Sequence, residues 1–515
     1  MKSLDASKAM SRSEYVARNA TVSLVTQVVK NLLGFVTRTI FIWMLGKELL
    51  GINSLFTEIM TMLSFAELGI GNAFVYALYR PLADGDSGHL KSLMSLFARA
   101  YRWIGLAVGA LGLALLPFLK LIVGDVSIGD DLLYSVYLLF VFNSAVSYFY
   151  VYRTSLITAD QRSYVVLIVQ ESVHLVQTIV QVVLLYLTKD FLLYTIVNVV
   201  ATVTSNVILA WWSGRRYPYL KERDAKPLGA EERRELMTNV KALIVYKIGE
   251  KVLGSTDNIF ISAIINVVTV GMYSNYQLLV NLFAALGGQV MNSVTASVGN
   301  ANATVDEDRK EEIFNGALCA CAWFFGLSAV GILLLSNAFI TLWVGPDYCL
   351  DVLSIFCIVL AFYVNNMHYP CITYRYTTGI FRYGKWMPIV ASVINIVMDV
   401  VLGSFIGLPG IMLATVISRV ATYEVVDPLI IYRHVFKRSA MPYFLRYGMY
   451  TGIVAFSCCA CWIALQAVPL SGWLGFAVDC VVVLVVYSAV FFLLSWRTSG
   501  LYVIRSFISN LAHRH

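Results

Sequence analysis

The sequence predicts an all-α polytopic membrane protein, and three observations carry this prediction. Of its 515 residues, 59% are hydrophobic and 13% are charged, whereas soluble chains average about 45–50% apolar and about 25% charged residues. Apolar stretches of about 20 residues, the length that crosses a bilayer as a helix, recur along the chain. The basic residues gather in every second segment between these stretches. Together these features exclude a cytosolic enzyme, a disordered chain and a secreted disulfide-rich module.

Fourteen transmembrane helices are expected, each mostly apolar over its length. Because fourteen is even, both termini lie on the same side of the membrane. The expected spans are 20–45, 49–79, 101–123, 132–157, 164–187, 190–212, 240–265, 268–298, 313–335, 352–374, 386–406, 410–432, 447–468 and 473–496.

The distribution of Lys and Arg predicts the orientation. The two termini and the loops after even-numbered spans hold 30 of the 38 basic residues, and the loops after odd-numbered spans hold only Lys47, Lys120 and Lys189. Since basic residues stay on the cytoplasmic side, we expect both termini to be cytoplasmic. The charged N-terminus lacks the short apolar core of a cleavable signal peptide.

A polar stretch at 213–242 separates two groups of six spans. It predicts an N-lobe over residues 1–219, with helices 1–6, and a C-lobe over 220–434, with helices 7–12. Residues 435–515 then add helices 13 and 14 and a cytoplasmic tail. The tail is expected to form an amphipathic helix, because its apolar residues recur at helical spacing: Leu501, Ile504, Ile508 and Leu511.

A weak internal repeat relates the two lobes. Moving the chain by 220 residues aligns span 1 with span 7, and Tyr152-Arg153 has a similar counterpart in Tyr374-Arg375. Because six spans separate the copies, equivalent helices run in the same direction, which predicts two parallel lobes around a central cavity. The identical pairs are Asn19/Asn239, Val25/Val245, Leu33/Leu253, Gly34/Gly254, Gly51/Gly271 and Ser54/Ser274.

Ionisable and polar residues inside spans 1 and 7 are the expected cavity lining, since burying such groups in lipid is costly. Helical geometry gathers them on one face of each span. The alternative for span 7 is that Lys247, Glu250 and Lys251 neutralise one another in a purely structural network. Their positive balance, with Arg153 and Arg375 at the cytoplasmic mouth, suits a phosphate or pyrophosphate. The set comprises Lys30, Asn31 and Arg38 in span 1 and Lys247, Lys251 and Asn258 in span 7, flanked by Glu250 and Asp257.

The remaining polar groups in the spans are interpreted as contacts between helices. The chain contains no nucleotide-binding motif, no catalytic signature and no metal-ligand spacing. We therefore expect no enzymatic activity, no resident cofactor and no nucleic-acid partner; Na⁺ or H⁺ remains open as a coupling ion, at Glu250 or Asp257. The residues interpreted as helix contacts are His368, Asp399, Arg419, Glu424 and Asp479, together with Glu171 and His174, for which a proton-linked pair is the alternative.

Four segments resemble bacterial polysaccharide flippases of the Wzx type, in the multidrug/oligosaccharidyl-lipid/polysaccharide exporter superfamily. The resemblance implies alternating access that moves an undecaprenyl-pyrophosphate-linked oligosaccharide across the bacterial plasma (inner) membrane, for capsule, O-antigen or exopolysaccharide. A polymerase and export proteins are candidate partners. The family's cationic positions fall on Lys30, Arg38, Lys247 and Lys251, whereas Asn258 occupies the repeat position of Arg38. The segments are 63–86, 156–165, 255–276 and 379–419.

Two other functions remain open. A cation-coupled drug or metabolite exporter of the same superfamily favours an acidic cavity, whereas spans 1 and 7 sum to a positive charge. A membrane polysaccharide polymerase usually carries a sizeable arginine-bearing outer loop, whereas the outer loops here are short.

Overall fold

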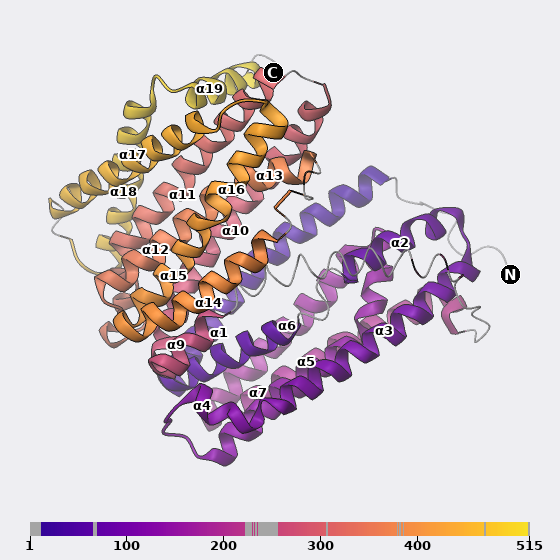
Figure 1. Cartoon of the computed structure of the whole chain (residues 1–515). Coiled ribbons are helices and arrows are strands. Elements are labelled where there is room, and N and C mark those ends of the chain that lie inside the picture. Colours follow the sequence, from indigo (N-terminus) through magenta and orange to yellow (C-terminus); the bar gives the residue numbers. More distant parts are fainter. Residues whose placement is uncertain are drawn as a thin grey trace. The chain divides into compact units, whose positions relative to one another are not determined.

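The computed structural model describes residues 12–64, 70–221, 229, 231, 234, 256–304, 307–378, 380, 383–384, 386–467 and 470–512. Within these residues the regular structure is helical and contains no β-strand (Figure 1). The predicted all-α class is therefore confirmed. The chain forms two compact units, Met1–Ile259 (unit 1) and Phe260–His515 (unit 2).

Unit 1 consists of long helices that pack lengthwise. Helix α3 packs along α5, α5 along α7, and α1 along α6 (Figure 1). The helices are α1 (Arg12–Leu63), α2 (Ile70–Asp84), α3 (Ser87–Ala114), α4 (Leu119–Val123), α5 (Asp130–Ala159), α6 (Ser163–Thr188) and α7 (Phe191–Arg216), with short 3₁₀ turns at Leu116–Phe118 and Pro218–Lys221.

Aromatic packing fixes α2 on α3. The rings of Phe74 and Phe97 stack with centroids 3.6 Å apart, and Tyr101 meets Phe74 edge-on at 5.8 Å. All three side chains are fully buried. From α5, the Tyr137 hydroxyl donates a hydrogen bond of 2.9 Å to the Gly112 carbonyl near the end of α3. This cluster forms part of the apolar core of unit 1.

Unit 2 is assembled around α11, against which α10, α12, α17, α18 and α19 pack. The Tyr487 hydroxyl of α18 donates to the Ala322 carbonyl in the middle of α11 at 3.0 Å. The helices are α9 (Asp257–Ile264), which crosses the unit boundary, α10 (Val267–Thr304), α11 (Glu307–Trp343), α12 (Val352–Met367), α13 (Tyr369–Thr378), α14 (Met387–Ile406), α15 (Leu408–Ala421), α16 (Tyr423–Ile431), α17 (Met441–Gln466), α18 (Gly472–Ser495) and α19 (Ser499–Ala512), with a 3₁₀ turn at Pro346–Tyr348 and a π-helical turn at Tyr432–Phe436.

Two of the expected spans in unit 2 are broken helices. The span expected at 352–374 divides into α12 and α13 at His368, and Pro370, which has no N–H, follows at the start of α13. The span expected at 410–432 divides into α15 and α16 at Thr422, whose dihedral angles of −121° and −85° are not helical. Hydropathy does not reveal these breaks, because it continues across both.

Eleven helices in the described part of the chain are long and apolar enough to cross a membrane, so the protein is a multi-pass membrane protein. The spans expected at 20–45 and 49–79 begin within one helix, α1, which Gly46 interrupts with a φ of 77°. Most of 240–265 lies outside the described residues. The number fourteen therefore stays a prediction.

The 220-residue repeat relates two helix breaks, one at Gly46 and one at Asn266. Gly46 interrupts α1, and Asn266, 220 residues later, lies between α9 and α10. The Asn266 side chain accepts a hydrogen bond from the Thr269 backbone N–H at 2.8 Å, which caps the start of α10. In the first copy, Gly46 allows the break because glycine tolerates a positive φ. In the second copy, Asn266 stabilises the break by capping the helix that follows.

Candidate functional site

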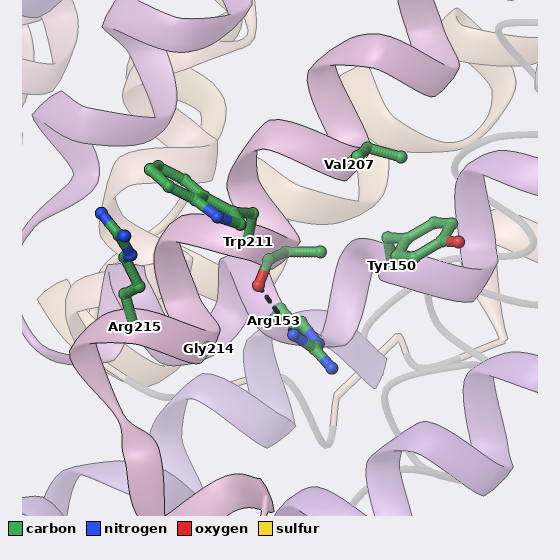
Figure 2. A pocket seen from close by; sticks show the side chains of 7 residues that line it. Tyr150, Arg153, Val207, Trp211, Gly214 and Arg215 are labelled. Atoms are coloured by element: carbon green, nitrogen blue, oxygen red, sulfur yellow. Dashed lines mark hydrogen bonds between the residues drawn. The ribbon is translucent and has the colours of Figure 1, made fainter.

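A pocket of about 380 Å³ lies between α5 and α7 in unit 1, beside the last turn of α7 (Figure 2). Two arginines, two aromatic residues and small or aliphatic residues form its wall, so it combines positive charge with apolar surface. This pocket is called the Arg153 pocket below. Its lining residues are Tyr150, Arg153, Val207, Ala210, Trp211, Gly214 and Arg215.

Arg153 is held in place by both helices. Its guanidinium donates a hydrogen bond of 2.7 Å to the Ala210 carbonyl on α7 (Figure 2). It donates another, of 3.2 Å, to the hydroxyl of the neighbouring Tyr152 on α5. A guanidinium has five N–H donors, and these bonds use two of them. The side chain is half-buried, so the remaining donors suit an anion that enters the pocket.

Arg215 supplies the second positive charge. Its guanidinium lies over the Trp211 ring, 4.6 Å from the ring centroid, and both side chains are exposed. Such cation–π contacts orient an arginine without consuming its hydrogen-bond donors. Since Arg215 and Arg216 lie in the last turn of α7, they also balance the negative end of the helix dipole. Arg216 does not line the pocket.

The turn between α5 and α6 fastens the end of α7 next to the pocket. Asp160 accepts a hydrogen bond from Arg162 at 2.9 Å and another from the Tyr217 hydroxyl at 2.8 Å. Burial and the neighbouring Asp160 carboxylate raise the pKa of Tyr217 well above its usual range, so the phenol stays a donor. This turn lies in segment 156–165, one of the segments that carry the family resemblance.

The two predicted cations of span 1 lie apart along α1. Lys30 is exposed, and Arg38, two turns further on, is half-buried and interacts electrostatically with Tyr194 on α7. The Tyr194 ring packs against Phe41 at 5.0 Å. Arg38 thus belongs to the packed layer between α1 and α7. The side chain of Asn31 lies outside the described residues.

Most of the predicted span-7 set lies outside the described residues, namely Lys247, Glu250 and Lys251. Asp257 and Asn258 open helix α9, where both are half-buried. A carboxylate in the first turn of a helix interacts favourably with the positive end of the helix dipole. This position gives Asp257 a local role in stabilising the start of α9.

Arg375 occupies a different environment from its repeat partner Arg153. It is nearly fully buried, pairs with Asp427 and donates a hydrogen bond of 2.9 Å to the Tyr383 carbonyl. The expected position at an open cavity mouth therefore does not hold in this structure. The physical reason is the carboxylate of Asp427, 52 residues along the chain, which no local pattern connects with Arg375.

Asp399, which the sequence predicts as a contact between helices, belongs to a second buried polar group. Asn395 and Asp399 on α14 are both fully buried. The Asn395 amide donates to Asp399 at 3.4 Å and to the Thr415 hydroxyl on α15 at 3.3 Å. The spacing of four residues places the two side chains on one face of α14, and this is the signal by which the sequence could have grouped them.

Comparisons with known proteins agree with this architecture. Solved structures that share the fold include "Lipid II flippase MurJ, inward closed conformation", with 15% sequence identity and a TM-score of 0.67 over 93% of this chain and 98% of that chain. An inward-facing multidrug resistance MATE family transporter of the MOP superfamily has 13% identity and a TM-score of 0.62 over 78% of this chain and 95% of that chain. A MOP superfamily transporter from Pyrococcus furiosus has 12% identity and a TM-score of 0.53 over 83% of this chain and 97% of that chain. No curated protein gave a significant sequence match. The family model described as "Polysaccharide biosynthesis protein" matches residues 16–298, more than half of the chain, and the protein belongs to that family.

Proposed function

We propose that the protein is a flippase that moves an undecaprenyl-pyrophosphate-linked oligosaccharide across the bacterial inner membrane. The lipid-linked unit is built on the cytoplasmic side and delivered to the outer side, where capsule, O-antigen or exopolysaccharide is assembled. Both termini are cytoplasmic in this proposal, and the two lobes expose a cationic cavity to each side in turn. The family assignment supports a role in polysaccharide biosynthesis.

The Arg153 pocket is the observation that carries the proposal. Two guanidiniums within one pocket favour a diphosphate, because each forms charge-assisted hydrogen bonds with phosphate oxygens. The Trp211 and Tyr150 rings and Val207 add apolar surface beside the charges, which suits the first sugar or the first isoprene units of a lipid-linked substrate. A free inorganic anion would gain no favourable contact from this apolar wall.

The other predicted cations extend the proposed path. Arg38, Lys30, Lys247 and Lys251 are proposed to carry the pyrophosphate further along the cavity, with Asn31 and Asn258 as hydrogen-bonding neighbours. Glu250 and Asp257 are the proposed alternatives for a coupling ion. Because this path leads through the lipid bilayer, the undecaprenyl chain is proposed to stay in the membrane while the headgroup crosses.

Purified protein reconstituted into vesicles with a fluorescent lipid-pyrophosphate oligosaccharide tests the proposal. Loss of one charge-assisted bond costs about 1.5–3 kcal/mol, so we expect Arg153→Ala to slow flipping by about tenfold or more. Arg153→Lys should retain part of the activity, because it keeps the charge but loses the planar fork. Arg216→Ala is the matched control, since this neighbouring arginine lies outside the pocket.

Other outcomes separate the alternatives. Wild-type rates for Arg153→Ala and Arg215→Ala would remove the pocket from the mechanism. Export of a cationic dye by wild-type protein, with no movement of the lipid-linked substrate, would favour the drug exporter. Elongation of the glycan would favour the polymerase. Mass spectrometry of the lipid that co-purifies with the protein identifies the sugar unit in the same preparation.

A further inference from the structure

Unit 2 contains a buried cluster of four ionisable side chains that the proposed substrate path does not use. His368 lies between α12 and α13, Arg375 lies on α13, and Glu424 and Asp427 lie on α16. Their exposed fractions are 0%, 3%, 6% and 1%. Burying so many charges is expensive unless they balance one another, so the protonation of this cluster is tightly constrained.

The imidazole of His368 is flanked by a carboxylate on each side. Its Nδ1 lies 3.1 Å from Oε1 of Glu424, and its Nε2 lies 2.9 Å from Oδ2 of Asp427. The second oxygen of Asp427 pairs with Arg375. Asp427 therefore has a permanent cationic partner, whereas the imidazole is the one basic group that contacts Glu424 among the described ion pairs.

This geometry requires an additional proton. A neutral imidazole has one N–H donor and one acceptor nitrogen, so it satisfies one carboxylate and opposes the lone pairs of the other. Both contacts become favourable only when the imidazole carries two protons or when Glu424 is protonated. In either form the cluster binds one proton more than it would with a neutral imidazole and two ionised carboxylates. His368 and Glu424 share this proton, so it is assigned to the two residues together.

Charge balance within the four residues leads to the same count. Arg375 and Asp427 cancel, so Glu424 leaves one buried negative charge unless the extra proton is present. Among the described residues, the other titratable groups near the cluster are phenols and a thiol, which are neutral at pH 7 at their ordinary pKa values. Arg419 is a permanent cation that lies over the Tyr423 ring, 5.7 Å from the ring centroid. Its charge lies outside this four-residue count, and the position of the imidazole between two carboxylates supports the extra proton independently of the count. These phenols and the thiol are Tyr363, Cys371, Tyr423, Tyr443 and Tyr447.

The cluster lies where two membrane helices are broken. His368 is the junction of α12 and α13, and Glu424 follows the junction of α15 and α16 at Thr422 by two residues. Backbone at such junctions has fewer hydrogen bonds to hold it than a continuous helix has. Removing the proton places two carboxylates around a neutral ring, which weakens the attachment of α16 to α13.

We propose that His368 and Glu424, oriented by Asp427 and Arg375, form a proton-binding site whose occupancy controls the packing of α16 against α13. Its use in the transport cycle, one proton released and rebound in each cycle, rests on the proposed flippase function. The proton-binding site itself does not depend on that function.

Thermal unfolding of the purified full-length protein tests the site without any substrate. His368→Gln removes the proton carrier and leaves Glu424 buried without a cation, so we expect Tm at pH 7 to fall by roughly 5–10 °C. The double variant His368→Gln/Glu424→Gln restores the charge balance and should recover most of that loss. His434→Gln, an exposed histidine stacked on Tyr383, is the matched control. A Tm for His368→Gln equal to wild type, or no recovery in the double variant, overturns the proposal.

Flipping in vesicles tests the use of the proton. One proton exchanged per substrate makes the accumulation ratio about tenfold larger for each unit of inward-directed pH gradient, and the double variant should lose this dependence. Flipping by wild-type protein that ignores the pH gradient overturns the coupling. A protein that flips no lipid at all contradicts the proposed function instead, and the recovery of Tm in the double variant distinguishes that case.

Discussion

Asp160 shows how one residue links a sequence motif to the candidate site. It ends α5, its carboxylate binds Arg162 at the start of α6, and it accepts the Tyr217 hydroxyl that follows α7. The sequence marks segment 156–165 as characteristic of the family, but it does not reveal the contact with Tyr217, 57 residues away. The structure gives the motif a mechanical role in holding the wall of the Arg153 pocket.

Replacing Asp160 should therefore destabilise unit 1. Asp160→Ala leaves the half-buried Arg162 and the buried Tyr217 hydroxyl without their shared acceptor, which costs about 1–3 kcal/mol. Thermal unfolding in detergent measures this loss. Asp84→Ala is the control, since Asp84 and Arg80 form an exposed pair at 3.8 Å, and such pairs contribute about 0–1 kcal/mol. Equal effects of the two variants would contradict the structural role of Asp160.

The two Tyr-Arg pairs mark what the sequence can and cannot predict about single residues. The repeat singled out both Arg153 and Arg375, and Arg153 lines a pocket between α5 and α7. The same pattern placed Arg375 at an open surface, whereas the structure buries it against Asp427. Helical spacing fixes which residues share a face of one helix, but it does not determine which neighbouring helix covers that face.

Among the elements, the α14–α15 hairpin has a tight backbone contact that depends on a glycine. Gly407 turns the chain with a φ of 66°, and a Cβ on Gly410 would collide with the Leu402 carbonyl group. This close approach lets α14 and α15 pack against each other. The spans expected at 386–406 and 410–432 predict a short connection at this point, in agreement with the turn at Gly407.

Gly410→Ala should weaken this hairpin, because the obstructing atom is backbone and cannot move aside freely. We expect a loss of about 1–3 kcal/mol, which is typical of overpacking, measured as a lower Tm. Gly452→Ala on α17 is the matched control, since a Cβ at that position would meet no atom within 4 Å. In the control, a helical glycine becomes alanine without a clash, which should leave Tm unchanged or higher. A Gly410→Ala protein as stable as that control would show that the hairpin relaxes.

At the same scale, the sequence predicted where most membrane helices lie but not where they break. The breaks at His368 and Thr422 fall within apolar stretches, and polar side chains contact each other or the backbone at both breaks. His368 pairs with two carboxylates of α16, and Thr422 donates to the Ser418 carbonyl at 2.5 Å. Hydropathy averages over such positions, so a broken helix and a continuous one give the same prediction.

At the scale of the whole molecule, the charge distribution predicts the orientation in the membrane. Glu48 and Ser127, from two loops expected outside, are hydrogen-bonded to each other. Glu311 and Arg438, from two loop-proximal regions expected inside, pair at 3.1 Å. These contacts agree with the alternation of loops between two sides, and the excess of basic residues predicts which side is cytoplasmic.

Cysteine labelling checks this orientation. In a background without native cysteines, Asp125→Cys, in an exposed loop expected outside, should react with a membrane-impermeant maleimide in intact cells. Ser439→Cys, exposed on the expected cytoplasmic side, should react only after permeabilisation. The reverse pattern would invert the orientation and with it the direction of transport.

The membrane potential should act directly on the proposed pyrophosphate-linked substrate. A pyrophosphate carries roughly two negative charges, and moving one elementary charge across 100 mV is worth about 2.3 kcal/mol. An interior-negative potential therefore favours outward movement of the headgroup by up to about 4–5 kcal/mol per 100 mV, and an inward-moving proton adds to this. Cavity cations that move with the headgroup reduce the gain.

Collapsing the potential with valinomycin and K⁺ should therefore slow flipping in vesicles even when the Na⁺ and pH gradients are intact. The variant His368→Gln/Glu424→Gln should keep this dependence on potential while losing its dependence on pH, because the headgroup charge remains. Asp257→Asn should leave both dependences in place if Asp257 serves only the first turn of α9. Flipping that ignores the potential, follows the Na⁺ gradient and is lost in Asp257→Asn would instead make Asp257 the coupling-ion site, because a bound cation would then compensate the charge of the headgroup as it crosses.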